Sequence, residues 1–267
     1  DDLLDLVVAT IGARALGDLG QGIAADLSDL LRTLAVLALA VLWALTPGLF
    51  TSQSPTETVA PSLLAPSSEH WFGTDVQGQD IYTRVVYGAR ASILVGVLAT
   101  FGVLVLGSFL GLLAGYVGGL VDTLISRLGD IFFAIPLLLS GIIFLSSLRD
   151  TEEIWGIPIQ GYFGVVIQVV LVFVLFGWPS LMRLMRSSVI QVKPNDYVQA
   201  ARALGASPMR IIRRHVLPNA MAPAIVVTTI NLGSYIAAEA TLSFLGIGLR
   251  PPTVSWGVMI NDGLTPL

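Results

Sequence analysis

The sequence predicts an all-α polytopic membrane protein, and its composition and apolar patterning carry the prediction. Hydrophobic residues make up 54% of the 267 residues and charged residues only 12%, about half the charged fraction of an average soluble domain. Five long uncharged runs are present, each close to the roughly 20 residues that a membrane helix needs. Because these runs lack the two-residue alternation of barrel strands, we expect a bundle of five helical spans.

The N-terminal third is expected to contain one span between two flanking segments. In the cytoplasmic segment 1–30, apolar residues recur at helical spacing, as in an amphipathic helix on the membrane surface or a helix packed on a partner. Span 1 lies within 31–50. Residues 51–90 form an external loop, in which Ile81 and Val85 indicate an interfacial helix just before span 2.

Residues 91–267 hold the other four spans and their connections. The uncharged runs are 91–121, 131–148, 154–182 and 216–238, with an external segment at 246–267. Span 2 carries glycines every fourth residue (Gly107, Gly111, Gly115), a spacing that lets helix backbones approach closely, within the chain or against a partner. Pro136 is placed to kink span 3, where Arg127 and Asp130 are spaced to pair.

The distribution of lysine and arginine predicts how the bundle is oriented. With five spans, ten of these residues fall on the side of the N-terminus and of the 183–218 loop, against four on the other side. The four are Arg84, Arg90, Arg149 and Arg250. Cytoplasmic loops carry the excess of Lys and Arg, so the N-terminus and the 183–218 loop are expected in the cytoplasm.

The cytoplasmic stretch 195–217 is expected to form two short helices. Asn195 or Asp196 is placed to cap the first helix, and Gly205 suits the left-handed position at its end. Ser207 and Pro208 restart a helix as its cap and first residue, and Pro218 is expected to end it. Composition alone also fits an ordinary basic loop with snorkelling arginines.

The order of residues in this stretch resembles the coupling motif of ABC-importer permeases: E-A-A, three residues, G, nine residues, I-x-L-P. Gln199, Ala200, Ala201, Gly205, Leu217 and Pro218 fall in that register, with Gln199 in place of Glu and His215 at the Ile position. The resemblance implies that the helices at 197–218, with Arg210 on the second, couple the chain to a cytoplasmic ATPase.

Two external segments narrow the resemblance. Residues 71–96 (WFGTDVQGQDIYTRVVYGARASILVG) and 242–263 (LSFLGIGLRPPTVSWGVMINDG) are similar to the dipeptide/oligopeptide/nickel permease family, and to its C-type subunit. This resemblance implies a type I ABC-importer transmembrane domain in the bacterial inner membrane. Members carry six spans, whereas this chain stops at Leu267 before a sixth.

The same resemblance implies the partners. These are a homologous B-type permease subunit, two ATPase subunits or one fused ATPase, and an extracytoplasmic substrate-binding protein, in contact with membrane lipid. ATP and Mg²⁺ are expected on the ATPases. The chain has no G-x-x-x-x-G-K-[ST] loop and no cysteine, so we expect a transport subunit that is not an enzyme and holds no cofactor. No long basic run indicates nucleic-acid binding.

Glu239 is the single carboxylate within a span's continuation. A carboxylate near bilayer depth costs a few kcal/mol, so its position requires a reason. It either faces the translocation path, loosely with Asn231 and Ser234, or hydrogen-bonds between spans. Catalytic residues and metal ligands are not expected.

The function predicted is import of dipeptides or oligopeptides, driven by ATP. Nickel or haem is the alternative cargo within the same family. An ATP-independent secondary transporter and a membrane scaffold are the alternatives from other classes, and the first would require more intramembrane carboxylates than Glu239 alone.

Overall fold

The computed structural model describes residues 27–264 except 150, 152, 155 and 156. Most of the predicted N-terminal segment 1–30 therefore lies outside the described residues. The first described helix is Leu27–Leu45, followed by the 3₁₀ turn η1 (Pro47–Leu49). A long loop then leads to α2 (Ile81–Val117), α3 (Gly119–Phe133) and α4 (Leu137–Ser147).

The second half of the chain continues this helical pattern. A two-stranded antiparallel ribbon, β1 (Glu153–Ile154) and β2 (Ile157–Pro158), precedes α5 (Gly161–Val192). Two short helices follow, α6 (Asp196–Ala203) and α7 (Pro208–Ile211). A π-helical turn, η2 (Ile212–Val216), joins α7 to α8 (Leu217–Phe244), and α9 (Trp256–Leu264) is the last element.

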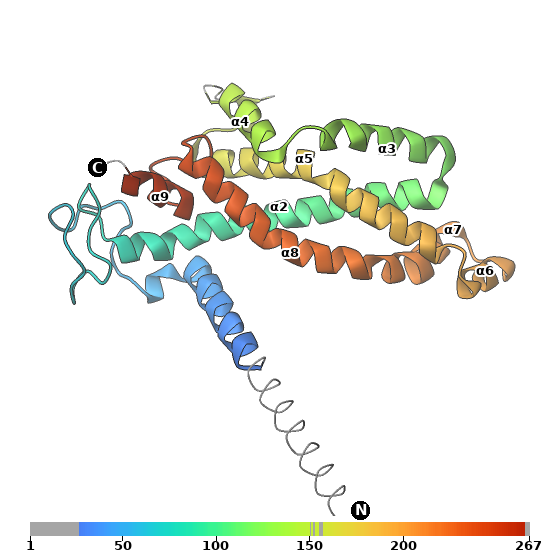
Figure 1. Cartoon of the computed structure of the whole chain (residues 1–267), viewed down its shortest axis with the longest axis horizontal. Helices are drawn as coiled ribbons and strands as arrows, with labels where there is room; N and C mark the ends of the chain where they lie inside the picture. The colour runs from blue at the N-terminus through green and yellow to red at the C-terminus, as the bar shows by residue number, and fades with distance from the viewer. Residues whose placement is uncertain (1–26, 150, 152, 155–156, 265–267) are drawn as a thin grey trace, which may run out of the picture.

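Three long helices, α2, α5 and α8, lie side by side along the long axis and enclose the core (Figure 1). Val95, Ala99 and Val103 of α2 are fully or almost fully buried. Phe173 of α5 stacks on Tyr235 of α8, with ring centroids 5.5 Å apart. Many other large apolar side chains are exposed, as expected where lipid is the solvent.

Within the described residues, four helices are long and apolar enough to cross a membrane, and the bent pair α3–α4 passes the same test when its two helices are taken together. Counted as one span, this pair brings the number to the five predicted. The expected interfacial helix before span 2 is not separate, because residues 81–90 form the first turns of α2. The carboxylate of Asp80 caps this helix by accepting a hydrogen bond from the Thr83 N–H at 2.9 Å.

The third span bends by 80° between α3 and α4. Pro136 lies at this break as the N-cap of α4, as its position in the sequence predicted. The predicted pairing of Arg127 with Asp130 is long, 3.8 Å. Asp130 also accepts from Arg183 of α5 at 2.8 Å, so the same carboxylate ties α3 to α5.

The glycine stripe of α2 packs against α5 of the same chain. A Cβ placed on Gly111 would lie 2.5 Å from the Met182 carbonyl oxygen, and one on Gly115 would lie 2.9 Å from the Arg186 carbonyl oxygen. The sequence left open whether this stripe faces the chain's own helices or a partner. In the structure, the glycine stripe brings two spans of the same chain together.

Candidate functional site

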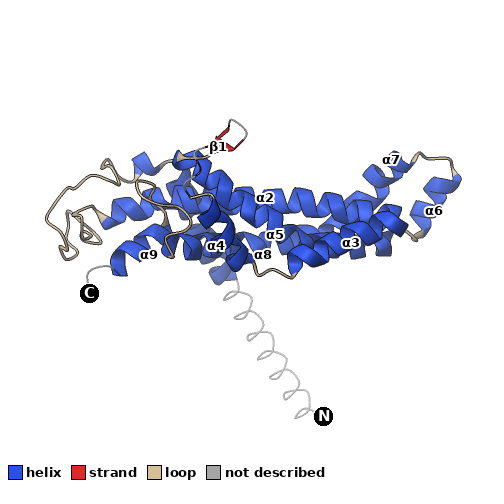
Figure 2. Ribbon diagram, turned by 90° about the horizontal axis from the view of Figure 1, so that it is seen from above, coloured by secondary structure: helices blue, strands red, loops and turns tan. Residues whose placement is uncertain are grey.

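The helices α6 and α7 stand beyond one end of the bundle, opposite α9 and the loop 51–80 (Figure 2). We call α6, α7 and η2, with their connecting turn at 204–207, the tip. Gly205 has the left-handed φ of +77° that only glycine adopts readily. Its N–H donates to the Arg202 carbonyl at 3.0 Å, and the next N–H, of Ala206, donates to the Ala201 carbonyl at 3.1 Å. This is the hydrogen-bond pattern of a Schellman motif, which fixes the reversal between α6 and α7.

The second limb of the tip differs from the sequence-based expectation. Pro208 starts α7 as predicted, but Pro218 does not end the helix. The chain continues as one helix from Pro208 to Phe244, because the turn before Pro218 widens to a π-helix in which the Leu217 N–H bonds to the Ile212 carbonyl. A proline lacks an N–H and crowds the preceding turn, and a π-bulge accommodates both effects. The tip is thereby joined without a break to α8.

The predicted capping side chains do not cap. Neither Asn195 nor Ser207 makes a side-chain hydrogen bond to the helix that it precedes. The Asn195 amide donates instead to the Tyr197 hydroxyl at 3.1 Å. The helix starts are therefore set by backbone conformation and by Pro208, not by caps.

Buried and exposed side chains alternate on the tip. Val198, Ile211 and Val216 are buried and hold the two limbs together. The turn and the start of α7 present apolar groups to the outside, with Leu204 89% and Met209 62% exposed. The tip thus has a rigid base and an uncovered apolar end.

The predicted coupling residues lie together on this tip. Gln199, Ala200, Gly205, Arg210 and Pro218 are exposed, whereas Ala201 and Leu217 are half-buried. The remaining arginines, Arg202, Arg213 and Arg214, are also exposed. An apolar end surrounded by cationic side chains suits a partner surface that offers a pocket with acidic groups at its edge.

The base of the tip is bound to the bundle. The Lys193 ammonium donates to the Tyr116 carbonyl at the end of α2, at 2.7 Å. The guanidinium of Arg186 makes two hydrogen bonds to the carboxylate of Asp122 in α3, at 2.5 and 2.6 Å. These contacts connect three spans to the segment that carries the tip.

The structure does not bring Glu239 together with the other two candidate path residues. Glu239 is fully buried. Its Oε1 accepts from the Ser243 hydroxyl at 2.7 Å, and the hydroxyls of Ser92 and Ser255 are further neighbours. Ser234 is exposed and Asn231 half-buried. Within this chain, Glu239 therefore packs between α2, α8 and the segment before α9.

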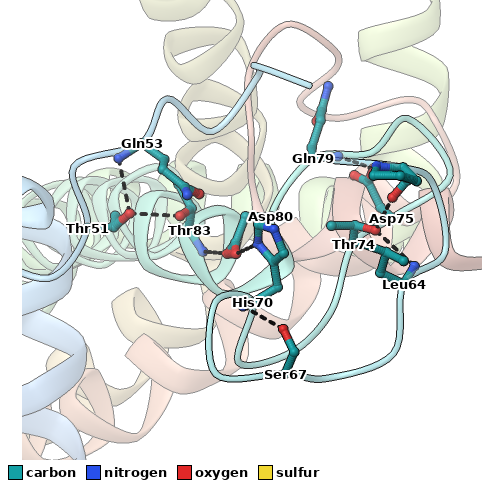
Figure 3. A network of polar contacts seen from close by, with 11 residues as sticks. Thr51, Gln53, Leu64, Ser67, His70, Thr74, Asp75, Gln79, Asp80 and Thr83 are labelled. Atoms are coloured by element: carbon teal, nitrogen blue, oxygen red, sulfur yellow. Dashed lines mark hydrogen bonds and ion pairs between the residues drawn. The ribbon is translucent and has the colours of Figure 1, made fainter. Parts of the chain in front are cut away.

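The opposite end of the bundle carries a polar network that joins the loop 51–80 to the start of α2 (Figure 3). The His70 ring Nδ1 is hydrogen-bonded to the Asp80 carboxylate at 2.9 Å. The backbone N–H of His70 donates to the Ser67 hydroxyl at 3.1 Å. The hydroxyls of Thr51 and Thr83 are 2.8 Å apart. This network gives the long loop a defined shape despite its lack of helices or long strands.

Sequence reasoning missed the role of one residue at this end of the bundle. Arg84 is buried and pairs with two carboxylates, Asp75 of the loop and Asp262 of α9, the latter at 2.6 Å. Trp256 adds a second link, because its indole N–H donates to the Val85 carbonyl at 3.1 Å. The two carboxylates are 9 and 178 residues from Arg84 in the sequence, so no local sequence pattern predicts these ion pairs.

Between residues 27 and 264, where described, no three His, Asp or Glu side chains gather as a metal site. The bundle resembles a solved membrane protein, "Inward facing conformations of the MetNI methionine ABC transporter", with a TM-score of 0.52 and 19% identity. The likeness covers 68% of this chain and 86% of that one. At this identity it speaks for the fold alone, and the fold is that of a type I ABC-importer transmembrane domain.

The family follows from the sequence matches. Residues 107–267 match the family described as binding-protein-dependent transport system inner membrane component. The dipeptide transport system permease protein DppC of Alkalihalophilus pseudofirmus is 42% identical over 86% of this chain and 71% of its own length. The oligopeptide transport system permease protein OppC of Bacillus subtilis is 38% identical over 76% of this chain and 62% of its own. The chain belongs to this family of multi-pass membrane permeases.

Proposed function

We propose that the chain is the permease subunit of an ATP-driven importer of dipeptides or oligopeptides. Two relatives named for these cargoes support the peptide class. The subunit forms half of a translocation path with a homologous B-type permease. Two ATPase subunits, or one fused ATPase, hydrolyse ATP, and an extracytoplasmic binding protein delivers the peptide.

The proposed orientation places the N-terminus and the tip in the cytoplasm. The tip and the loop 51–80 lie at opposite ends of the bundle (Figure 1). The excess of Lys and Arg that the sequence gives to the side of the 183–218 loop, ten against four, supports this orientation. The binding protein then approaches the surface formed by residues 70–90 and 246–263, where the Arg84 ion pairs fix the loop and α9 to each other.

The observation that carries the proposal is the tip. Its exposed Leu204 and Met209 supply an apolar contact for the ATPase, and its π-helical turn leads straight into α8. A movement of the ATPase domains therefore displaces a helix that crosses the whole bundle. The tip transmits the difference in contact energy between two packings and performs no covalent chemistry. Asn231 and Ser234 on α8 are the polar groups we assign to the path.

Replacing Gly205 by valine tests the coupling role. A Cβ on Gly205 meets nothing within 4 Å, so the substitution acts only through the φ of +77°. A β-branched residue there costs about 1–2 kcal/mol, enough to lower the ratio of native to non-native tip conformations about 5- to 30-fold. We expect Gly205→Val to reduce ATP-driven dipeptide uptake by proteoliposomes while the protein still inserts and the ATPases still hydrolyse ATP.

Gly48→Val is the matched control. This position also has no atom within 4 Å of an added Cβ and has no left-handed φ, and it lies in η1 at the other end of the bundle. Uptake by the control should equal that of the wild type. Unchanged coupling of uptake to hydrolysis in Gly205→Val would contradict the proposed role of the tip.

A further inference from the structure

A cavity of about 1150 Å³ lies near the outer end of the bundle. Its walls come from the first described helix (Leu27–Leu45), the outer part of α2, the start of α5 and the segment 250–254. These walls belong to membrane spans and their outer connections, so the cavity faces the outer half of the bilayer rather than the cytoplasmic tip.

Three of the four outer arginines line this one cavity. Arg90, Arg149 and Arg250 all contribute to the cavity wall, and the fourth, Arg84, pairs with Asp75 and Asp262. Each comes from a different part of the chain: α2, the turn after α4 and the segment after α8. Cations are depleted on the outer side of membrane proteins, so their convergence on a single hollow indicates an anionic group there.

The polar groups at this rim have unused hydrogen-bonding capacity. Arg90 and Arg149 are exposed, and no side-chain hydrogen bond or ion pair joins either of them to the rest of the described chain. The hydroxyl groups of Tyr87 and Tyr162, which also line the cavity, are likewise unbonded within the described part. Two guanidinium groups and two hydroxyl groups can therefore donate hydrogen bonds to the oxygens of a phosphodiester.

The cavity becomes apolar with depth. Along α2 its lining runs from Arg90 through Leu94 to Val97, and at 1.5 Å per residue this is a descent of about 10 Å. Val41 and Phe163 extend the apolar wall on the two neighbouring helices. The deepest amide, that of Gln168, is already used, since it donates to the Ile159 carbonyl at 2.6 Å. A leaflet's hydrocarbon layer is about 15 Å thick, so the descent fits much of one acyl chain.

We propose that this cavity is a binding site for one anionic phospholipid of the outer leaflet. The headgroup phosphate is held by Arg90, Arg149 and Arg250 at the rim, and an acyl chain lies along α2 towards Val97. A peptide cargo fits less well, because its backbone would face the apolar lower wall without hydrogen-bond partners. The lipid site goes beyond the transport function proposed above and does not depend on the identity of the cargo.

Native mass spectrometry of the assembled transporter tests the site. The detergent-purified complex is titrated with dioleoyl phosphatidylglycerol or dioleoyl phosphatidylcholine, and the lipid retained per permease subunit is measured. We expect one phosphatidylglycerol to be retained preferentially. The double variant R90Q/R149Q should weaken that retention by roughly fivefold per arginine, and V97W, which fills the apolar end, should lower retention of both lipids.

The control R32Q/R127Q removes the same charge elsewhere, from two exposed arginines, and should retain phosphatidylglycerol like the wild type. Glycerol 3-phosphate at millimolar concentration should not displace the lipid, because it lacks the acyl chain. Equal retention of the two lipids by the wild type overturns the proposal, even if a variant fails to assemble. Equal loss in R32Q/R127Q, or occupation of the cavity by cargo or by a helix of the partner permease, also overturns it.

Discussion

Replacing Gly111 by alanine is expected to force α2 and α5 apart. The added Cβ would lie 2.5 Å from the Met182 carbonyl oxygen, 2.7 Å from the Met185 Cβ and 3.0 Å from the Arg186 N. The shortest contact is about 0.9 Å inside the 3.4 Å at which ordinary van der Waals contact begins. The neighbours are backbone atoms and a Cβ, so no side-chain rotation relieves the overlap and the helices themselves must move.

The change in stability expected for Gly111→Ala follows from two opposed effects. Alanine favours a helix over glycine by up to about 1 kcal/mol, whereas overpacking in a close-packed interior costs about 1–3 kcal/mol. Gly233 provides the matched control, because it lies inside α8 and an added Cβ there meets nothing within 4 Å. Gly233→Ala should therefore be neutral or slightly stabilising, and Gly111→Ala should be less stable than this control by about 1–3 kcal/mol.

Thermal unfolding of the purified transporter in detergent, followed by size-exclusion chromatography, measures the difference. For a protein of this size each kcal/mol corresponds to about 2–4 °C in the midpoint. A Gly111→Ala midpoint at or above that of Gly233→Ala would refute the reasoning. It would mean that the stripe does not hold α2 against α5 within the chain.

Two further substitutions test the outer end of the bundle. Arg84→Met leaves two partly buried carboxylates without their cation and should cost about 3 kcal/mol; hydrogen–deuterium exchange in α9 should rise, and unchanged exchange would show that Asp262 does not anchor α9. Ser243→Ala removes one hydrogen bond to Glu239 and the acceptor of the Leu249 N–H, and the two lost buried hydrogen bonds should together cost about 2 kcal/mol. A denaturant titration measures the free energy of unfolding of each variant. The double variant that also changes Glu239 to leucine should lose less stability than the sum of the two single changes. A loss equal to that sum would show that the two side chains do not interact.

The features predicted best from the sequence are local ones. The five spans follow from the length of the uncharged runs, and the reversal at Gly205 from a glycine placed after a short helix. The bend at Pro136 is likewise decided by one residue and its neighbours. In each case the physical cause lies within a few residues of its effect.

The errors have causes that sequence neighbours do not reveal. Pro218 was expected to stop a helix, yet a π-turn before it lets the helix continue. Glu239 had two readings, and only the packing of α2 and of the segment before α9 decides for burial. The role of Arg84 depends on Asp262, 178 residues away. Long-range contacts of this kind require the fold to be known first.

The tip's contact with an ATPase is tested most directly by a cross-link from Leu204. The chain has no cysteine, so Leu204→Cys places one thiol at the exposed end of the tip. In membranes containing the whole transporter, a short thiol-to-amine cross-linker should join this residue to an ATPase subunit, with a yield that changes when ATP is added. Cross-linking to lipid or to other chains only, with the ATPase assembled and hydrolysing, would contradict the account.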